Sequence, residues 1–198
     1  MASIIHKRYI VHPYKFNMWI GIVSMVMIFA AFTSAFVVKK GDLPVWQHIQ
    51  LPQIFTVSTI VIAISSACMH FAYSAFRKNN VNMFRGFMLL TFILGAAFLT
   101  LQIQGWMQLR DAGIFLDGNV SGSFIYVISG THFIHVLGGV IALMAFAVLS
   151  FTKYRHGIIT NDPEKDLNNK VGMEVMMTYW HFVDILWIYL YFFFIINK

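Results

Sequence analysis

Five long apolar runs, each bounded by polar residues, constrain the fold of this chain more than any other feature of its 198 residues. A membrane-spanning helix needs about 20 mostly apolar residues at about 1.5 Å per residue, and each run is long enough. Backbone groups inside hydrocarbon cannot bond to water, so each run is expected to be α-helical. The runs lack the alternation of barrel strands. The predicted spans are about 17–38, 53–76, 86–108, 124–151 and 174–196.

Composition supports a membrane protein. The chain is 59% hydrophobic and 11% charged, with a mean hydropathy of +0.69, whereas soluble domains are about 45–50% apolar and about 25% charged. We therefore assign the net charge of +6 to basic residues flanking the bilayer and expect no nucleic-acid partner. Cys68 is the only cysteine, which excludes a disulfide framework and a thiolate metal site. We expect one all-α transmembrane domain over residues 1–198.

The connections between the spans are polar, and their charge predicts an orientation. Ten Lys and Arg residues lie before the first span and in the second and fourth connections, and four lie on the other side. The N-terminus is therefore predicted to be cytoplasmic and the C-terminus outside. The first run is longer than the 7–15 residues of a signal-peptide core, which predicts a retained helix. Pro52 is expected in the first turn of the second helix, and Asn161-Asp162-Pro163 predicts a turn within the soluble segment 153–170.

Asp184 is the only deeply embedded carboxylate of the predicted spans. It follows His181 by three residues, so both side chains lie on one helix face. Two interpretations are open: a structural pair, whose members bond each other or a neighbouring helix, and a proton relay. Because a single embedded acid makes a poor relay, we favour the structural pair.

His132 and His135 form a second pair at the same spacing, in the fourth span. His135, Gly138, Ala142 and Ala145 follow helical spacing and place small side chains on one face. Small residues let helices approach closely, so this face is predicted to be a packing seam, either within the chain or with another subunit. Near the span ends, tryptophans are expected at the membrane interface: Trp19, Trp106 and Trp180.

The same residues permit other functions. A bis-histidine heme needs imidazoles at one depth on two helices, and His70 and His181 meet that condition. A free-standing b-type cytochrome is therefore an alternative, though not the favoured one. All four prolines lie outside the span interiors, and five spans cannot divide into two equal repeats, so a transporter is disfavoured. The residues alone predict a five-helix membrane protein that binds no cofactor and works inside a complex.

Two stretches resemble a known family closely. YWHFVDILW at residues 179–187 resembles the YWHFVD-x-x-W signature in the last helix of cytochrome c oxidase subunit III, and GTHFIHVLGG at residues 130–139 resembles its G-x-H-x-x-H-V-x-x-G element. Residues 94–106 are similar to the family's LG-x-x-FL-x-x-Q-x-x-x-W helix, and residues 24–29 to its SE-x-x-FF helix. The chain resembles the five-helix bacterial form, which lacks the first two helices.

The resemblance implies a non-catalytic subunit of a proton-pumping heme-copper oxidase in the bacterial cytoplasmic (inner) membrane. Electrons would come from cytochrome c or quinol, and heme and copper would reside in partner subunits. The chain would pack against subunit I, hold phospholipid, support proton uptake and stability, and join a larger respiratory supercomplex. Two positions depart from the family: Met25 and Gly105 replace glutamates that members often carry, which puts in doubt any role of those carboxylates.

Overall fold

The computed structural model describes residues 12–43, 49–152 and 163–197. Within them the chain forms five α-helices and no strands, and each helix contains a stretch long and apolar enough to cross a bilayer. The all-α, five-span prediction is therefore confirmed. The helices are α1 (Pro13–Asp42), α2 (Gln53–Arg77), α3 (Val81–Asp111), α4 (Val120–Thr152) and α5 (Pro163–Asn197).

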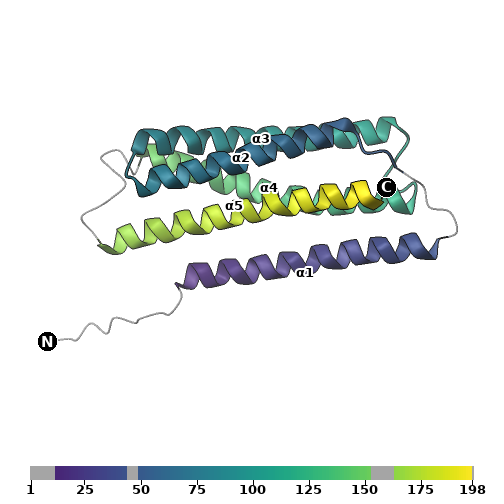
Figure 1. Cartoon of the computed structure of the whole chain (residues 1–198), viewed down its shortest axis with the longest axis horizontal. Helices are drawn as coiled ribbons and strands as arrows, with labels where there is room; N and C mark the ends of the chain where they lie inside the picture. The colour runs from purple at the N-terminus through teal and green to yellow at the C-terminus, as the bar shows by residue number, and fades with distance from the viewer. Residues whose placement is uncertain (1–11, 44–48, 153–162, 198) are drawn as a thin grey trace.

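α1 begins at one end of the bundle, and α5 ends at the opposite end (Figure 1). Which end faces the cytoplasm stays a prediction. Several residues of the charge count lie outside the described part of the chain: Lys7, Arg8, Lys153, Arg155 and Lys198.

The helices extend beyond the apolar spans, because helical hydrogen bonding continues where the hydrocarbon ends. The largest difference is in α5, which begins at Pro163 although the span was predicted from residue 174. Proline fits a first helical position, since the N–H it lacks would have no helical partner there. The predicted turn at Pro163 is thus wrong for that residue, and Asn161 and Asp162 lie outside the described residues. Pro52 caps α2 instead of lying in its first turn.

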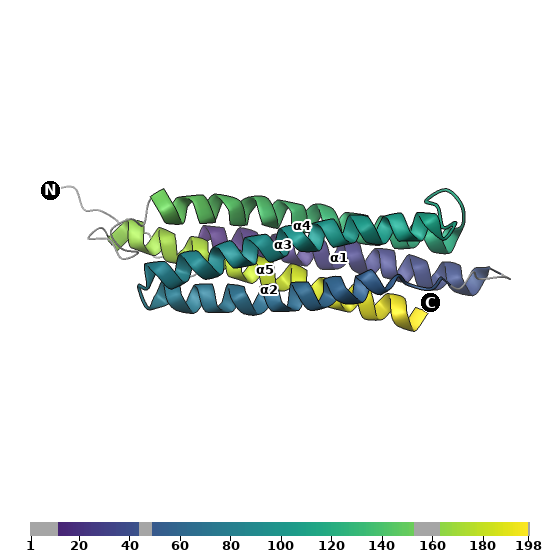
Figure 2. The same ribbon diagram turned by 90° about the horizontal axis from the view of Figure 1, so that it is seen from above.

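The helices pack as a bundle in which α2 and α3 make the most extensive contact (Figure 2). α4 packs against α3, α5 packs against α2 and α4, and α1 covers α4 and α5 at the edge of the bundle (Figure 1). Cationic side chains join helix ends: Lys40 Nζ donates to the Asn197 carbonyl at 2.9 Å, and Arg85 Nε donates to the Ser150 carbonyl at 2.9 Å. These bonds satisfy carbonyls that have no helical partner.

Candidate functional site

Trp180 is the centre of the contact between α3, α4 and α5. Its side chain is 0% exposed, and its Nε1 donates to Ser65 Oγ of α2 at 3.2 Å. A Cβ atom added at Gly95 would lie 2.8 Å from the indole, and one added at Gly139 would lie 2.9 Å from it. Both distances are shorter than van der Waals contact, so only glycine fits on either side of the ring. These two glycines let the helices close around Trp180, which is buried between them; its depth relative to the membrane interface stays a prediction.

The other two tryptophans differ from Trp180 in exposure. Trp19 of α1 is 58% exposed. Trp106 of α3 is partly buried, and its Nε1 donates to Ser129 Oγ of α4 at 3.0 Å. Their place at a membrane interface stays a prediction.

The small residues of α4 that were predicted to form a packing seam do not all face a neighbouring helix. Gly139 packs against Trp180 and Tyr179, whereas a Cβ atom at Gly138 would meet no atom within 4 Å. Ala142, one turn further along α4, is partly buried and borders the unfilled space that Gly138 faces. Gly138 thus makes no close contact with another described helix, and a contact with another subunit, the second interpretation of the seam, stays a prediction.

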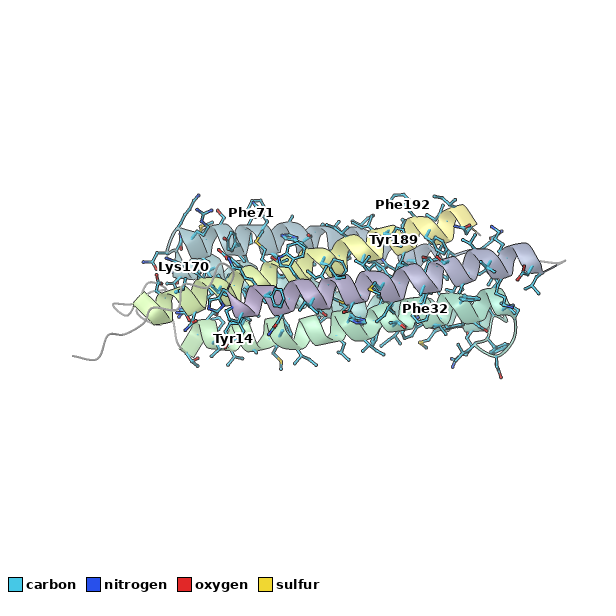
Figure 3. All side chains as sticks on the ribbon, turned by 90° about the horizontal axis from the view of Figure 1, so that it is seen from below. Tyr14, Phe32, Phe71, Lys170, Tyr189 and Phe192 are labelled. Atoms are coloured by element: carbon cyan, nitrogen blue, oxygen red, sulfur yellow. The ribbon has the colours of Figure 1, made fainter. Side chains whose placement is uncertain are left out.

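Gly138 and Ala142 line a groove of about 590 Å³ between α1, α4 and α5. Tyr14, near the start of α1, lies at one end of this groove beside α4 (Figure 3). The volume is within the range of pockets that hold small ligands. The lining is almost entirely apolar: Tyr14, Asn17, Met18, Gly21, Met25, Gly138, Ala142, Phe146, Gly172, Val175, Met176 and Tyr179.

His132 and His135 both face Phe29 of α1, with ring centroids 6.3 and 6.0 Å from that of Phe29. His132 is 0% exposed and stacks on Trp187 at 5.1 Å. Among the described residues neither ring nitrogen of His132 has a hydrogen-bond partner. His135 Nδ1 bonds the Thr131 carbonyl at 2.8 Å. Both rings therefore pack within an aromatic layer of the bundle, and their role in holding the subunit together stays a prediction.

A row of hydrogen bonds crosses from α2 to α5. The Ser66 hydroxyl and His181 Nδ1 lie 2.6 Å apart, so His181 bonds a neighbouring helix and not Asp184. The hydroxyls come from Thr56, Thr59, Ser66 and Tyr73, which recur at helical spacing on one side of α2. The other members of the row are Thr56 with Tyr191 at 2.7 Å, Trp187 with Thr59 at 3.0 Å, and Tyr73 with Glu174 at 3.3 Å. This spacing along α2 is the sequence signal for the row of hydrogen bonds, and it is visible only when the four residues are taken together.

Asp184 is on α5, one turn after His181, and is 1% exposed. Its carboxyl group lies near the Ser66 hydroxyl but outside hydrogen-bond geometry, and neither oxygen has a partner among the described residues. Burying a charged carboxylate without a partner costs several kcal/mol. Asp184 is thus in the core, where no described contact would stabilise a charge on its carboxyl group.

The two positions that depart from the family pattern are both packed with apolar groups. Met25 is buried at the wall of the groove. A Cβ atom at Gly105 would lie 2.5 Å from the Phe55 ring of α2, so this ring occupies the space that a side chain at position 105 would need. The chain therefore has no room for a carboxylate at 105 while Phe55 holds its present rotamer.

His70, the other histidine of the heme alternative, is exposed on α2. It borders a depression of about 340 Å³ at the end of α2, and His181 is not part of that lining. Among the described residues, no three His, Cys, Asp or Glu side chains converge as metal ligands would.

Comparison with known proteins gives the family. A family model described as cytochrome c oxidase subunit III matches residues 3–197. The chain is 30% identical to cytochrome c oxidase subunit 3 of Corynebacterium diphtheriae, over 73% of this chain and 65% of that protein. It is 26% identical to the Thermostichus vulcanus subunit 3, over 86% and 80% of the two chains. It is 23% identical to the cytochrome bo(3) ubiquinol oxidase subunit 3 of Buchnera aphidicola, over 92% and 85%. With its five apolar helices, the chain belongs to the cytochrome c oxidase subunit III family.

Proposed function

We propose that this chain is the non-catalytic subunit III of a proton-pumping heme-copper oxidase that passes electrons from cytochrome c to O2, in the cytoplasmic membrane of a bacterium. The match of the family model to residues 3–197 carries the proposal. The chain would pack against subunit I, and the redox metals would reside in the partner subunits. A larger respiratory supercomplex is a further expected partner.

Co-purification tests this proposal. The tagged chain, extracted in mild detergent from its native membrane, should bring down heme, copper and the other oxidase subunits in fixed ratio. After dissociation from the complex, the chain alone should contain neither metal. Stoichiometric iron or copper on the isolated chain would contradict the proposal. Heme iron in particular would favour a b-type cytochrome, in which case His181→Ala should abolish the Soret band.

A role in proton uptake and durability is part of the proposal. Lys15 and Glu174 form an ion pair at the end of the bundle predicted to face the cytoplasm, and Tyr73 donates to the same carboxylate. Such partly exposed titratable groups can exchange protons with water, and a subunit bearing them would maintain proton supply. Oxidase depleted of this chain should pump fewer protons per electron and inactivate after fewer turnovers than the intact complex.

We also propose that the groove between α1, α4 and α5 holds a phospholipid acyl chain. Its apolar lining suits a lipid tail. A packed helix, about 10–12 Å in diameter, would need several times its volume of about 590 Å³. Gly138→Leu should fill the groove and remove one lipid from the purified complex, as measured by native mass spectrometry. Gly130→Leu is the matched control, because its Cβ also faces open space; equal lipid content in both variants would contradict the assignment.

For the electron donor of the oxidase, one observation favours quinol as a second candidate. The Buchnera relative is named as a subunit of a ubiquinol oxidase, and the alignment covers 92% of this chain. The same role in a quinol oxidase is therefore the alternative. Activity of the purified complex with reduced cytochrome c, compared with its activity with quinol, decides between them.

A further inference from the structure

The outer edge of the contact between α2 and α5 carries polar side chains where a lipid-facing surface would be apolar. His70 is exposed on α2, one turn after Ser66. His181 of α5 is partly exposed and bonds Ser66 through Nδ1. We refer to the surface formed by His70, Ser66 and His181 as the histidine face. Elsewhere the outer surface is apolar at comparable positions, as at Ile93 of α3 and Ile185 of α5, which are both exposed.

The histidine face lies too deep for water or lipid headgroups to cover it. His70 precedes Arg77, the last residue of α2, by seven residues, and His181 follows Glu174 by seven. At about 1.5 Å per residue, both rings lie about 10 Å from those polar ends, within a hydrocarbon core about 30 Å thick. Lipid tails offer no hydrogen bond, and an unsatisfied polar group in hydrocarbon costs several kcal/mol.

The histidine face also has hydrogen-bonding capacity to spare. A neutral imidazole carries one donor and one acceptor nitrogen. Within the described part of the chain no hydrogen bond reaches the His70 ring, and the bond to Ser66 uses one of the two nitrogens of His181. Ionisable side chains inside a membrane almost always face the bundle interior or a water-filled cavity, and pair with another polar group. The face is therefore incomplete in the chain alone.

We propose that the histidine face packs against a transmembrane helix of another subunit of the same oxidase, and that this helix presents a polar side chain with a hydrogen-bond acceptor to His70. This inference rests on the proposed function, because it needs partner subunits in the same membrane. The depression beside His70 supports it, since a volume of about 340 Å³ can receive a side chain from a neighbouring helix. The depression is lined by His70, Tyr73, Ser74, Arg77 and Lys78.

A phospholipid headgroup is the competing occupant, because Arg77 and Lys78 are basic. Those two residues lie at the end of α2, where a phosphate could reach them. A phosphate bound by these two residues would lie at the shallow end of the depression, whereas His70 lines its deeper part, about 10 Å further along α2. The position of His70 thus favours a protein partner.

Site-specific photocrosslinking tests the proposal in the intact membrane. A benzophenone amino acid placed at His70 in the full chain should yield an adduct with one oxidase subunit, identified by mass spectrometry. The same probe at Ile93 is the matched control and should yield lipid adducts only. Lipid adducts alone at both positions, or an adduct with a protein outside the oxidase or with a second copy of this chain, would overturn the inference.

A pair of substitutions tests the hydrogen bond itself. In His70→Leu the fraction of this chain retained with heme and copper after detergent extraction should fall at least fivefold, whereas His70→Gln should keep most of it. Full retention in His70→Leu, or equal loss in both variants, would refute the hydrogen bond. Failure of the unmodified chain to co-purify with heme and copper would instead refute the proposed function.

Discussion

Replacing Gly139 by alanine should destabilise this chain, although alanine is the better helix former. The new Cβ would lie 2.9 Å from Trp180 and 3.0 Å from Tyr179. Carbon atoms pack best at about 3.5–4.0 Å, so the overlap is severe. The indole cannot withdraw toward α3, because Gly95 already contacts its opposite edge, and its Nε1 is bonded to Ser65.

The size of the effect follows from two opposing contributions. Overpacking a rigid core site costs about 1–3 kcal/mol. Exchanging glycine for alanine within a helix returns up to about 1 kcal/mol. With the full gain, the net loss should be up to about 2 kcal/mol, which lowers the ratio of folded to unfolded chain by as much as about 30-fold.

The assay is unfolding of the purified full chain by titrating SDS into mild detergent, followed by tryptophan fluorescence. Gly130→Ala is the control on the same helix: its Cβ meets nothing within 4 Å, so it should stabilise by about 0.5–1 kcal/mol. In a Trp180→Leu background most of this loss should disappear, since only the contact with Tyr179 at 3.0 Å then remains. An unchanged loss in that background would refute the reasoning.

Three further predictions concern the polar groups of α5 and use the same assay. Ser66→Ala should cost about 0.5–1.5 kcal/mol, because it leaves His181 without its bond, and the loss should vanish in a His181→Leu background. Asp184→Asn should leave the free energy of unfolding unchanged or raise it, because neither carboxyl oxygen has a described partner and a side chain that cannot ionise costs less to bury. A loss above about 1 kcal/mol would show that the carboxyl group has a partner. Glu174→Gln should cost at most about 1 kcal/mol and less in high salt, because its pair with Lys15 is partly exposed; a loss independent of salt would contradict this.

The number and type of helices could be predicted from the sequence because the bilayer leaves few alternatives. A run of about 20 apolar residues in hydrocarbon must satisfy its backbone internally, so hydropathy alone locates the span. The start of α5 at Pro163 could not be located in this way. Beyond the hydrocarbon the residues are polar, and hydropathy does not distinguish a helix from a loop there.

The partners of the site residues depend on how the helices are rotated against one another, which periodicity does not give. His181 and Asp184 share a face as predicted, but the partner of His181 is Ser66, 115 residues away on another helix. Gly138 and Gly139 are equally small and adjacent in sequence. Successive residues of a helix differ by about 100° of rotation. This rotation turns Gly138 toward the groove and Gly139 toward Trp180.

The contact between Gly105 and Phe55 links two positions on different helices. A relative with glutamate at the position of Gly105 cannot also carry a phenylalanine in this rotamer at the position of Phe55, so the two should vary together across the family. Reintroducing the acid by mutation would thus require a smaller residue at 55 in the same variant. An evolutionary path between the two forms would pass most easily through a sequence with both positions small.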